Sequence, residues 1–225
     1  MTGALAALRQ VLTAAAEPGR APAMRAYMRE QFDFLGVPTP ARRRAAKAFI
    51  HAGRDMDSAQ LLALAEQLWQ QPEREFQYVA IDLLDRHIAR LTPDSLPALE
   101  ALVQSKPWWD SVDGLASWVI GGLVGRHRAL QARMDQLSRH PDIWLRRVAI
   151  LHQLGYKTST DHARLFDYCA ANAGDAEFFI RKAIGWALRE YAYTAPDAVR
   201  DFVNATPLAP LSRREALKHF AKEPA

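Results

Sequence analysis

The sequence predicts an all-α protein, and three observations support this fold class. Apolar residues recur at i, i+3, i+4 and i+7 nearly from end to end, which is the period of an amphipathic helix. Pro and Gly fall between these segments, and no run alternates apolar and polar residues as a strand does. The helical pattern itself recurs about every 34 residues, which is typical of a solenoid of stacked helical pairs.

The individual helices follow from their periodicity and their starts. The clearest ones are expected over residues 58–70, 75–89 and 144–154, and a capped basic helix is expected over 211–219. Asp57-Ser58 and Thr92-Pro93 supply a capping side chain or a first-turn proline at helix starts. About a dozen helices joined by short turns are expected in all.

The repeat is visible as three Ala-Ile pairs that begin at residues 80, 149 and 183. The intervals are 69 and 34 residues, and Leu115 occupies the register that the longer interval skips. Helices that begin near 75, 110, 144 and 177 are therefore predicted to be copies of one unit. This predicts one HEAT-like α-solenoid domain of antiparallel helical pairs over residues 1–225.

One position of this repeat attracts attention because it carries mixed charge. Two residues before each aligned position stand Tyr78, Asp113, Arg147 and Arg181, and equivalent positions in a solenoid point the same way. An acid between arginines indicates either a functional site or a ladder of salt bridges between repeats. The spacing alone leaves both interpretations open.

Composition restricts the class of protein. The chain has 225 residues, of which 49% are hydrophobic and 24% charged, and no segment resembles a secretory signal or an apolar membrane span. A single cysteine, Cys169, excludes internal disulfides and favours a reducing cytoplasm. The histidines are scattered and are expected at or near the surface, so neither a metal site nor a cofactor is expected. Solenoids of this size are often monomers, and a monomer is expected.

Charge is uneven along the chain. The formal net charge is +4, and residues 1–112 contain 13 basic and 13 acidic side chains, whereas residues 113–225 contain 16 and 12. Because neutralising phosphates supplies DNA affinity that is independent of sequence, a basic partner surface is expected in the second half. The charge alone does not show that the partner is a nucleic acid.

The residues around Asp113 suggest chemistry. Trp109 and Asp113 stand at i and i+4 and share a helix face, whereas Trp108 lies about 100° away and can enter the core. An indole beside a carboxylate suits a sugar or a flat cationic ring. The alternative is that both tryptophans anchor the core and Asp113 pairs locally.

A second cluster over residues 177–192 interleaves basic and aromatic side chains, a moderate signal for nucleic acid. Its members are Phe178, Phe179, Arg181, Lys182, Trp186 and Arg189. Gly185 is costly inside a helix and predicts the close approach of a neighbouring helix. Arg213 and Arg214 on the last helix could hold a phosphate or could belong to a solvated helix.

Taken together, these segments resemble one family over nearly the whole chain. The matching stretches are Tyr27-Met28, residues 34–40, 72–77, 108–113, 143–147, 178–192 and 208–216. They resemble the AlkD-type DNA alkylation repair glycosylases, which are HEAT-like solenoids. The resemblance implies that Asp113 is the catalytic acid and that Trp109 and Trp186 cradle the sugar of the lesion. Arg147 corresponds to the arginine beside the acid, because it keeps the repeat register and Arg146 does not.

Further roles follow from the same resemblance. The resemblance implies a concave basic face that binds DNA. Tyr27, Phe178 and Phe179 match residues of the family and are expected to contact DNA there. The basic residues expected to do the same are Arg181, Lys182, Arg189, Arg213 and Arg214. The implied activity is a monofunctional glycosylase of base excision repair that hydrolyses cationic N3- and N7-alkylated purines from duplex DNA without flipping the base. It is expected in a bacterial cytoplasm, on the nucleoid, with no metal, cofactor or membrane.

Two other functions stay open at this point. A non-enzymatic relative could bind damaged or distorted DNA on the same solenoid and tolerate the loss of Asp113. A protein-interaction solenoid would have an apolar or acidic groove and no affinity for duplex DNA, which the basic row and the aromatic residues disfavour.

Overall fold

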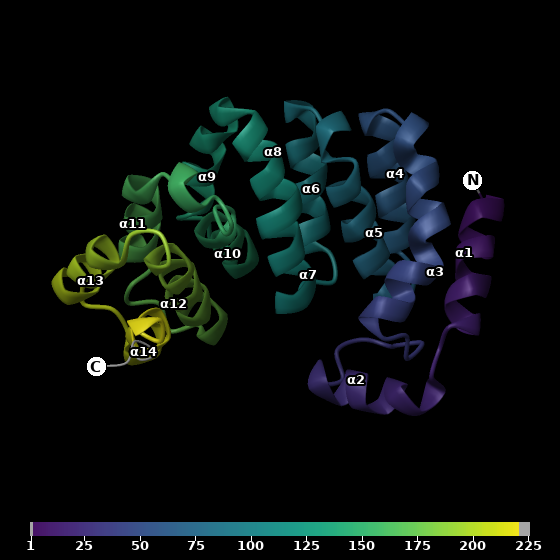
Figure 1. Cartoon of the computed structure of the whole chain (residues 1–225), viewed down its shortest axis with the longest axis horizontal. Helices are drawn as coiled ribbons and strands as arrows, with labels where there is room; N and C mark the ends of the chain where they lie inside the picture. Colours follow the sequence, from purple (N-terminus) through teal and green to yellow (C-terminus); the bar gives the residue numbers. More distant parts are fainter. Residues whose placement is uncertain (1, 221–225) are drawn as a thin grey trace. The chain divides into compact units, whose positions relative to one another are not determined.

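The computed structural model describes residues 2–220, and this part of the chain is helical with no β-strand (Figure 1). The all-α prediction is confirmed. The chain forms two compact units, Met1–Ala98 and Leu99–Ala225, called here the N-terminal and C-terminal units. The boundary falls within α6 (Leu96–Gln104).

The N-terminal unit contains five further helices, in which α3 packs against α1 and α5, and α4 packs against α5. They are α1 (Thr2–Ala14), α2 (Ala21–Tyr27), α3 (Thr39–Ala52), α4 (Ser58–Trp69) and α5 (Arg74–Arg86). Asp57 caps α4 in a reciprocal capping box with Gln60. The buried carboxylate of Glu75 accepts hydrogen bonds from the amides of residues 35–37 and so fixes the loop before α3.

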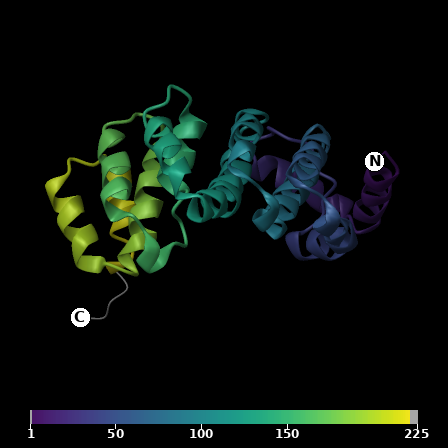
Figure 2. The same cartoon turned by 90° about the horizontal axis from the view of Figure 1, so that it is seen from above.

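The C-terminal unit has two layers of helices. One contains α7 (Trp109–Gly114), a π-helical segment (Leu115–Ile120), α8 (Gly121–Arg126), α10 (Ile143–Leu151), α12 (Phe178–Ala192) and α14 (Pro210–Ala216). The other contains α9 (Gln131–Leu137), α11 (His162–Ala171) and α13 (Pro196–Ala205). In the first layer α10 packs against both α7 and α12, and α12 packs against α14. Figure 2 shows the green and yellow helices of this unit running side by side.

The predicted repeat is present in the helices. α5, α7, α10 and α12 begin at Arg74, Trp109, Ile143 and Phe178, so successive starts are 34 or 35 residues apart. The aligned residues at 80, 115, 149 and 183 are all fully buried. Each copy therefore presents the same apolar position to the core, as expected of a helical-repeat protein.

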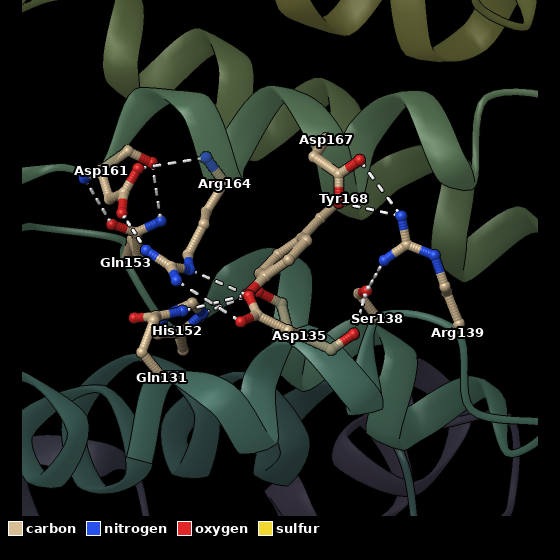
Figure 3. A network of polar contacts seen from close by, with 11 residues as sticks. Gln131, Asp135, Ser138, Arg139, His152, Gln153, Asp161, Arg164, Asp167 and Tyr168 are labelled. Atoms are coloured by element: carbon tan, nitrogen blue, oxygen red, sulfur yellow. Dashed lines mark hydrogen bonds and ion pairs between the residues drawn. The ribbon is translucent and has the colours of Figure 1, made fainter. Parts of the chain in front are cut away.

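A polar network joins α9 and α11 of the second layer to the residues that follow α10 (Figure 3). The ring of His152 lies 2.7 Å from the carbonyl oxygen of Ala149, and Gln131 donates to the hydroxyl of Tyr168, which donates to Asp135. The expectation that the histidines lie near the surface was wrong for His152, which is fully buried, because the carbonyl oxygen of Ala149 and the side-chain oxygen of Gln131 satisfy its ring nitrogens. Burial lowers the pKa of His152 to about 4, so the ring is neutral at pH 7.

Candidate functional site

A buried ion pair joins three helices of the C-terminal unit. Asp113 of α7 is only 8% exposed, and Arg147 of α10 is 3% exposed. The arginine donates from Nε to Oδ1 at 2.6 Å and from Nη2 to Oδ2 at 2.8 Å, which is bidentate geometry. Its third nitrogen, Nη1, donates to the carbonyl oxygen of Phe179 in α12. One guanidinium thus fixes the carboxylate and links α7, α10 and α12.

Repeat register explains this pairing. Asp113 and Arg147 hold the same position in successive copies, so their side chains meet where α7 and α10 pack together. Arg146, the neighbouring residue, turns away and pairs with Asp175 at 2.8 Å. Arg181, the next member of the row, donates from Nε to the backbone oxygen of Asp175. The row therefore contains one inter-repeat salt bridge rather than a continuous ladder.

Two opposing effects act on the pKa of Asp113. Burial raises the pKa of its carboxyl, and the charge and hydrogen bonds of Arg147 work to lower it; the net shift is upward. Each carboxylate oxygen receives one bond from Arg147, which leaves further lone pairs for a water molecule or a sugar. The site holds an anion whose charge is only partly compensated.

Aromatic side chains gather at the helix starts beside this ion pair. Trp108 lies just before α7, Trp144 in the first turn of α10 and Phe179 in the first turn of α12. Their ring centroids are 5.0–6.0 Å apart, and Phe178 stacks edge-on against Phe179 at 5.5 Å. Such contacts add about 0.5–1.5 kcal/mol each to area burial and hold the three starts together. The sequence pattern did not predict this cluster, because its three rings stand at different distances from the aligned positions 115, 149 and 183.

The aromatic residues expected on the ligand differ in exposure. Trp109 is half-buried and stands one turn before Asp113, whereas Trp186 is 36% exposed on α12. Tyr27 is 70% exposed at the end of α2 in the N-terminal unit. Trp118 in the π-helical segment is also exposed, and nothing in the sequence pattern singled it out.

The expected basic residues differ in the partners that they already have. Lys182 and Arg189 both pair with the carboxylate of Glu215 on α14. Arg213 is turned toward α13, where it donates to the backbone oxygen of Val203 and the side chain of Asn204. Exposed Arg214 makes no ion pair with any residue in 2–220.

Groups for other chemistries are not assembled in the described part of the chain. Within residues 2–220 no three His, Cys, Asp or Glu side chains come together as a metal site, and no helix is long and apolar enough to cross a membrane. The thiol of Cys169 is buried in α11, and this burial raises its pKa, so it is not a ready nucleophile.

Comparison with known proteins accords with this geometry. A family model described as DNA alkylation repair enzyme matches residues 8–220. The chain belongs to this family. A solved structure described as a predicted DNA alkylation repair enzyme from Enterococcus faecalis is 35% identical, with a TM-score of 0.87 over 92% of this chain and 98% of that chain.

Two solved structures of lower sequence identity share the fold of this alkylation repair protein. The AlkD2 structure from Streptococcus mutans is 15% identical, with a TM-score of 0.63 over 90% of this chain and 98% of that chain. The smu.31 structure from the same species is 16% identical, with a TM-score of 0.62 over 80% and 97%. No curated protein sequence matches. The helical-repeat fold and the family are thus established.

Proposed function

We propose that this protein is a monofunctional DNA glycosylase that removes cationic N3- and N7-alkylated purines from duplex DNA. The observation that carries the proposal is the Asp113 carboxylate, which is buried beside aromatic rings and oriented by hydrogen bonds from Nε and Nη2 of Arg147. A fixed anion in a partly dehydrated site stabilises positive charge that develops in a transition state far better than an exposed one.

The reaction needs little from the protein beyond this anion. An N3- or N7-alkylated purine is already cationic, so the bond from C1′ to the base nitrogen breaks with its electron pair leaving on a neutral base. The sugar becomes oxocarbenium-like, and the carboxylate of Asp113 stabilises its charge. Water then adds to C1′ and gives up its proton to this carboxylate and from there to solvent. The products are the free base and an abasic site.

The proposed roles of the surrounding residues rest on the family and on the exposure of their side chains. Trp109 and Trp186 are proposed to contact the sugar of the lesion, with the base left in the stack. Phe178, Phe179 and Tyr27 are proposed to contact the duplex. Among the basic residues, Lys182, Arg189 and Arg214 are the proposed phosphate contacts.

Arg181 and Arg213 take a different place in this proposal from the other basic residues. Both already donate to backbone oxygens of their own unit. Their first contribution is therefore to the packing of the helix ends. The protein is proposed to act as a monomer in the bacterial cytoplasm, on the nucleoid, and to use no metal or other cofactor.

One observation favours a second function. Asp113 is already paired on both oxygens and is little exposed, which is also how a purely structural carboxylate would look. The alternative is a non-enzymatic protein that binds damaged or distorted DNA on the same helical repeats.

Product analysis separates the two functions. Duplex DNA that carries one N7-methylguanine is incubated with the protein, and the free base and strand integrity are measured. The glycosylase releases methylguanine and leaves a strand that breaks only after alkali. Binding without any base release supports the alternative, and direct strand cleavage contradicts a monofunctional mechanism.

A further inference from the structure

The carboxylate of Glu215 is the centre of a cluster of three cations. Oε1 lies 2.7 Å from Nζ of Lys218 and 3.0 Å from Nζ of Lys182, and Oε2 lies 3.1 Å from Nη1 of Arg189. The Glu215 side chain is 7% exposed, whereas the three basic side chains are between 28% and 49% exposed. An acid covered by partly exposed cations leaves a surface that is net positive by two charges.

The position of the acid depends on a glycine. A Cβ atom added at Gly185 of α12 would lie 2.4 Å from Cβ of Glu215 and 2.9 Å from the backbone oxygen of Ser212. The absence of a side chain at residue 185 therefore lets α14 pack directly against α12. Lys182 and Arg189 stand about one turn before and one turn after this contact, so both can reach the acid.

The same arrangement places the cations around an exposed indole. Lys182, Trp186 and Arg189 stand at i, i+4 and i+7 of α12 and so share one stripe of the helix. Without the acid, three like charges so close together would repel one another and spread into solvent. Burial works to raise the pKa of Glu215, but the hydrogen bonds and charges of Lys218 and Lys182 lower it to about 2, so the acid is an anion at every physiological pH.

We propose that Glu215 is a positioning residue that gathers these three cations into one binding site for a backbone phosphate of duplex DNA. The inference rests on duplex DNA being the substrate, as proposed above. A phosphate bound there sits beside the stripe that carries Trp186, so the cluster sets the register of the duplex on α12. The acid thus strengthens the binding of an anion by ordering its ligands.

Two simpler accounts of Glu215 make different predictions. If only net charge matters, neutralising the acid adds one positive charge and tightens DNA binding. If the acid only fastens α14 to α12, neutralising it lowers thermal stability and leaves the salt dependence of DNA binding unchanged. If Glu215 instead orders the three cations for a phosphate, as proposed, neutralising it weakens DNA binding and changes the salt dependence of that binding.

The test measures affinity of the full chain for an undamaged duplex over a range of salt, for wild type, Glu215→Gln and Glu190→Gln. Glu190 lies on the same helix but lines a different cavity with Gln153 and Tyr191, so its substitution makes the same charge change away from the cluster. Glu215→Gln is expected to weaken binding by about tenfold, the effect of one lost charged hydrogen bond. The slope of log K against log salt should become shallower by about 0.9, as for one lost phosphate contact, and Glu190→Gln should change neither.

Lys218→Gln keeps the proposal testable if Glu215→Gln is too unstable, because Lys218 is half-exposed and follows the last helix. It should reduce the slope by about the same amount. Binding by Glu215→Gln that equals or exceeds that of Glu190→Gln overturns the inference, as does an unchanged slope in Lys218→Gln. A wild type that binds and responds as predicted but releases no alkylated base contradicts the glycosylase alone. A wild type that does not bind duplex DNA contradicts both.

Discussion

Two buried carboxylates of the C-terminal unit differ in how fully their charge is compensated. Glu215 has three cationic partners and a pKa lowered to about 2, whereas Asp113 has one and a pKa shifted upward because burial outweighs that partner. An anion whose charge is poorly compensated, as that of Asp113 is, gains the most stabilisation when a new positive charge appears beside it. Asp113 is therefore the better residue for stabilising an oxocarbenium-like sugar, and Glu215 the better one for organising cations.

This difference predicts an unusual pH dependence. The active form of Asp113 is the anion, so single-turnover base release should fall as the pH falls through its raised pKa, at a higher pH than for an ordinary carboxyl. Arg147→Gln removes the nearest cation and should move the inflection to still higher pH, because the anion then loses its compensation.

The control for this profile is thermal unfolding of Arg147→Gln, since removing one partner of a buried pair costs about 3–5 kcal/mol of stability. Rates are compared only where both proteins are folded. An inflection at or below the ordinary carboxyl range in wild type, or the same inflection in both proteins, would contradict the role assigned to this pair.

At the scale of the helices, close contacts between helices of the first layer decide where the functional side chains lie. α14 reaches α12 only because residue 185 has no side chain. In the same way α8 reaches the residue after α10 at Gly121, where an added Cβ would lie 2.2 Å from the backbone oxygen of His152. The second contact follows directly after the π-helical segment that continues α7 beyond Asp113. These close approaches replace the larger side chains that ordinary helix packing uses.

Gly185→Ala is predicted to destabilise the protein by about 1–3 kcal/mol, the usual cost of forcing extra volume into a packed contact. In an unconstrained helix interior the same substitution gains about 1 kcal/mol, so the sign of the change is diagnostic. Gly3→Ala in α1 is the matched control, because an added Cβ there meets nothing within 4 Å. Thermal unfolding of both variants checks this, and a Gly185→Ala protein more stable than wild type would contradict the packing described.

The sequence predicts the features that follow from the helical repeat. It does not predict those that depend on contacts between distant helices. The 34-residue register located the helix starts and selected Arg147 over Arg146, and Gly185 was correctly expected to admit a neighbouring helix. The identity of that neighbour and the role of Glu215 depend on two helices separated by α13, which no local pattern encodes. The burial of His152 also depends on a partner from another helix, because the side-chain oxygen of Gln131 on α9 contacts its ring.

At the scale of the whole molecule, the positive charge of the second half belongs to the C-terminal unit together with the candidate site. Not every arginine there is available to a phosphate, since several are bound to carbonyl oxygens or carboxylates of their own unit. The number of available cations, rather than the formal charge, sets the salt dependence of DNA binding. That the two units act as one domain stays a prediction.

The adjacent pair Arg213 and Arg214 tests this distinction. Arg214→Gln should make the slope of log K against log salt shallower by about 0.9 and leave stability unchanged, because its side chain is exposed and unpaired within residues 2–220. Arg213→Gln should leave the slope unchanged and lower stability by about 1–3 kcal/mol, because it removes donors to α13. The reverse pattern would show that the phosphate contacts are assigned wrongly.

The central claim is that Asp113 performs glycosidic hydrolysis, and the most direct measurement is single-turnover release of N7-methylguanine from duplex DNA by wild type, Asp113→Asn and Asp110→Asn. The two variants make the same charge change three residues apart on α7. Release by wild type, a loss on the order of 10³-fold in Asp113→Asn with duplex binding retained, and near-normal release by Asp110→Asn are the predicted results. Equal release by wild type and Asp113→Asn, or no release by wild type from a duplex that it binds, would contradict the account.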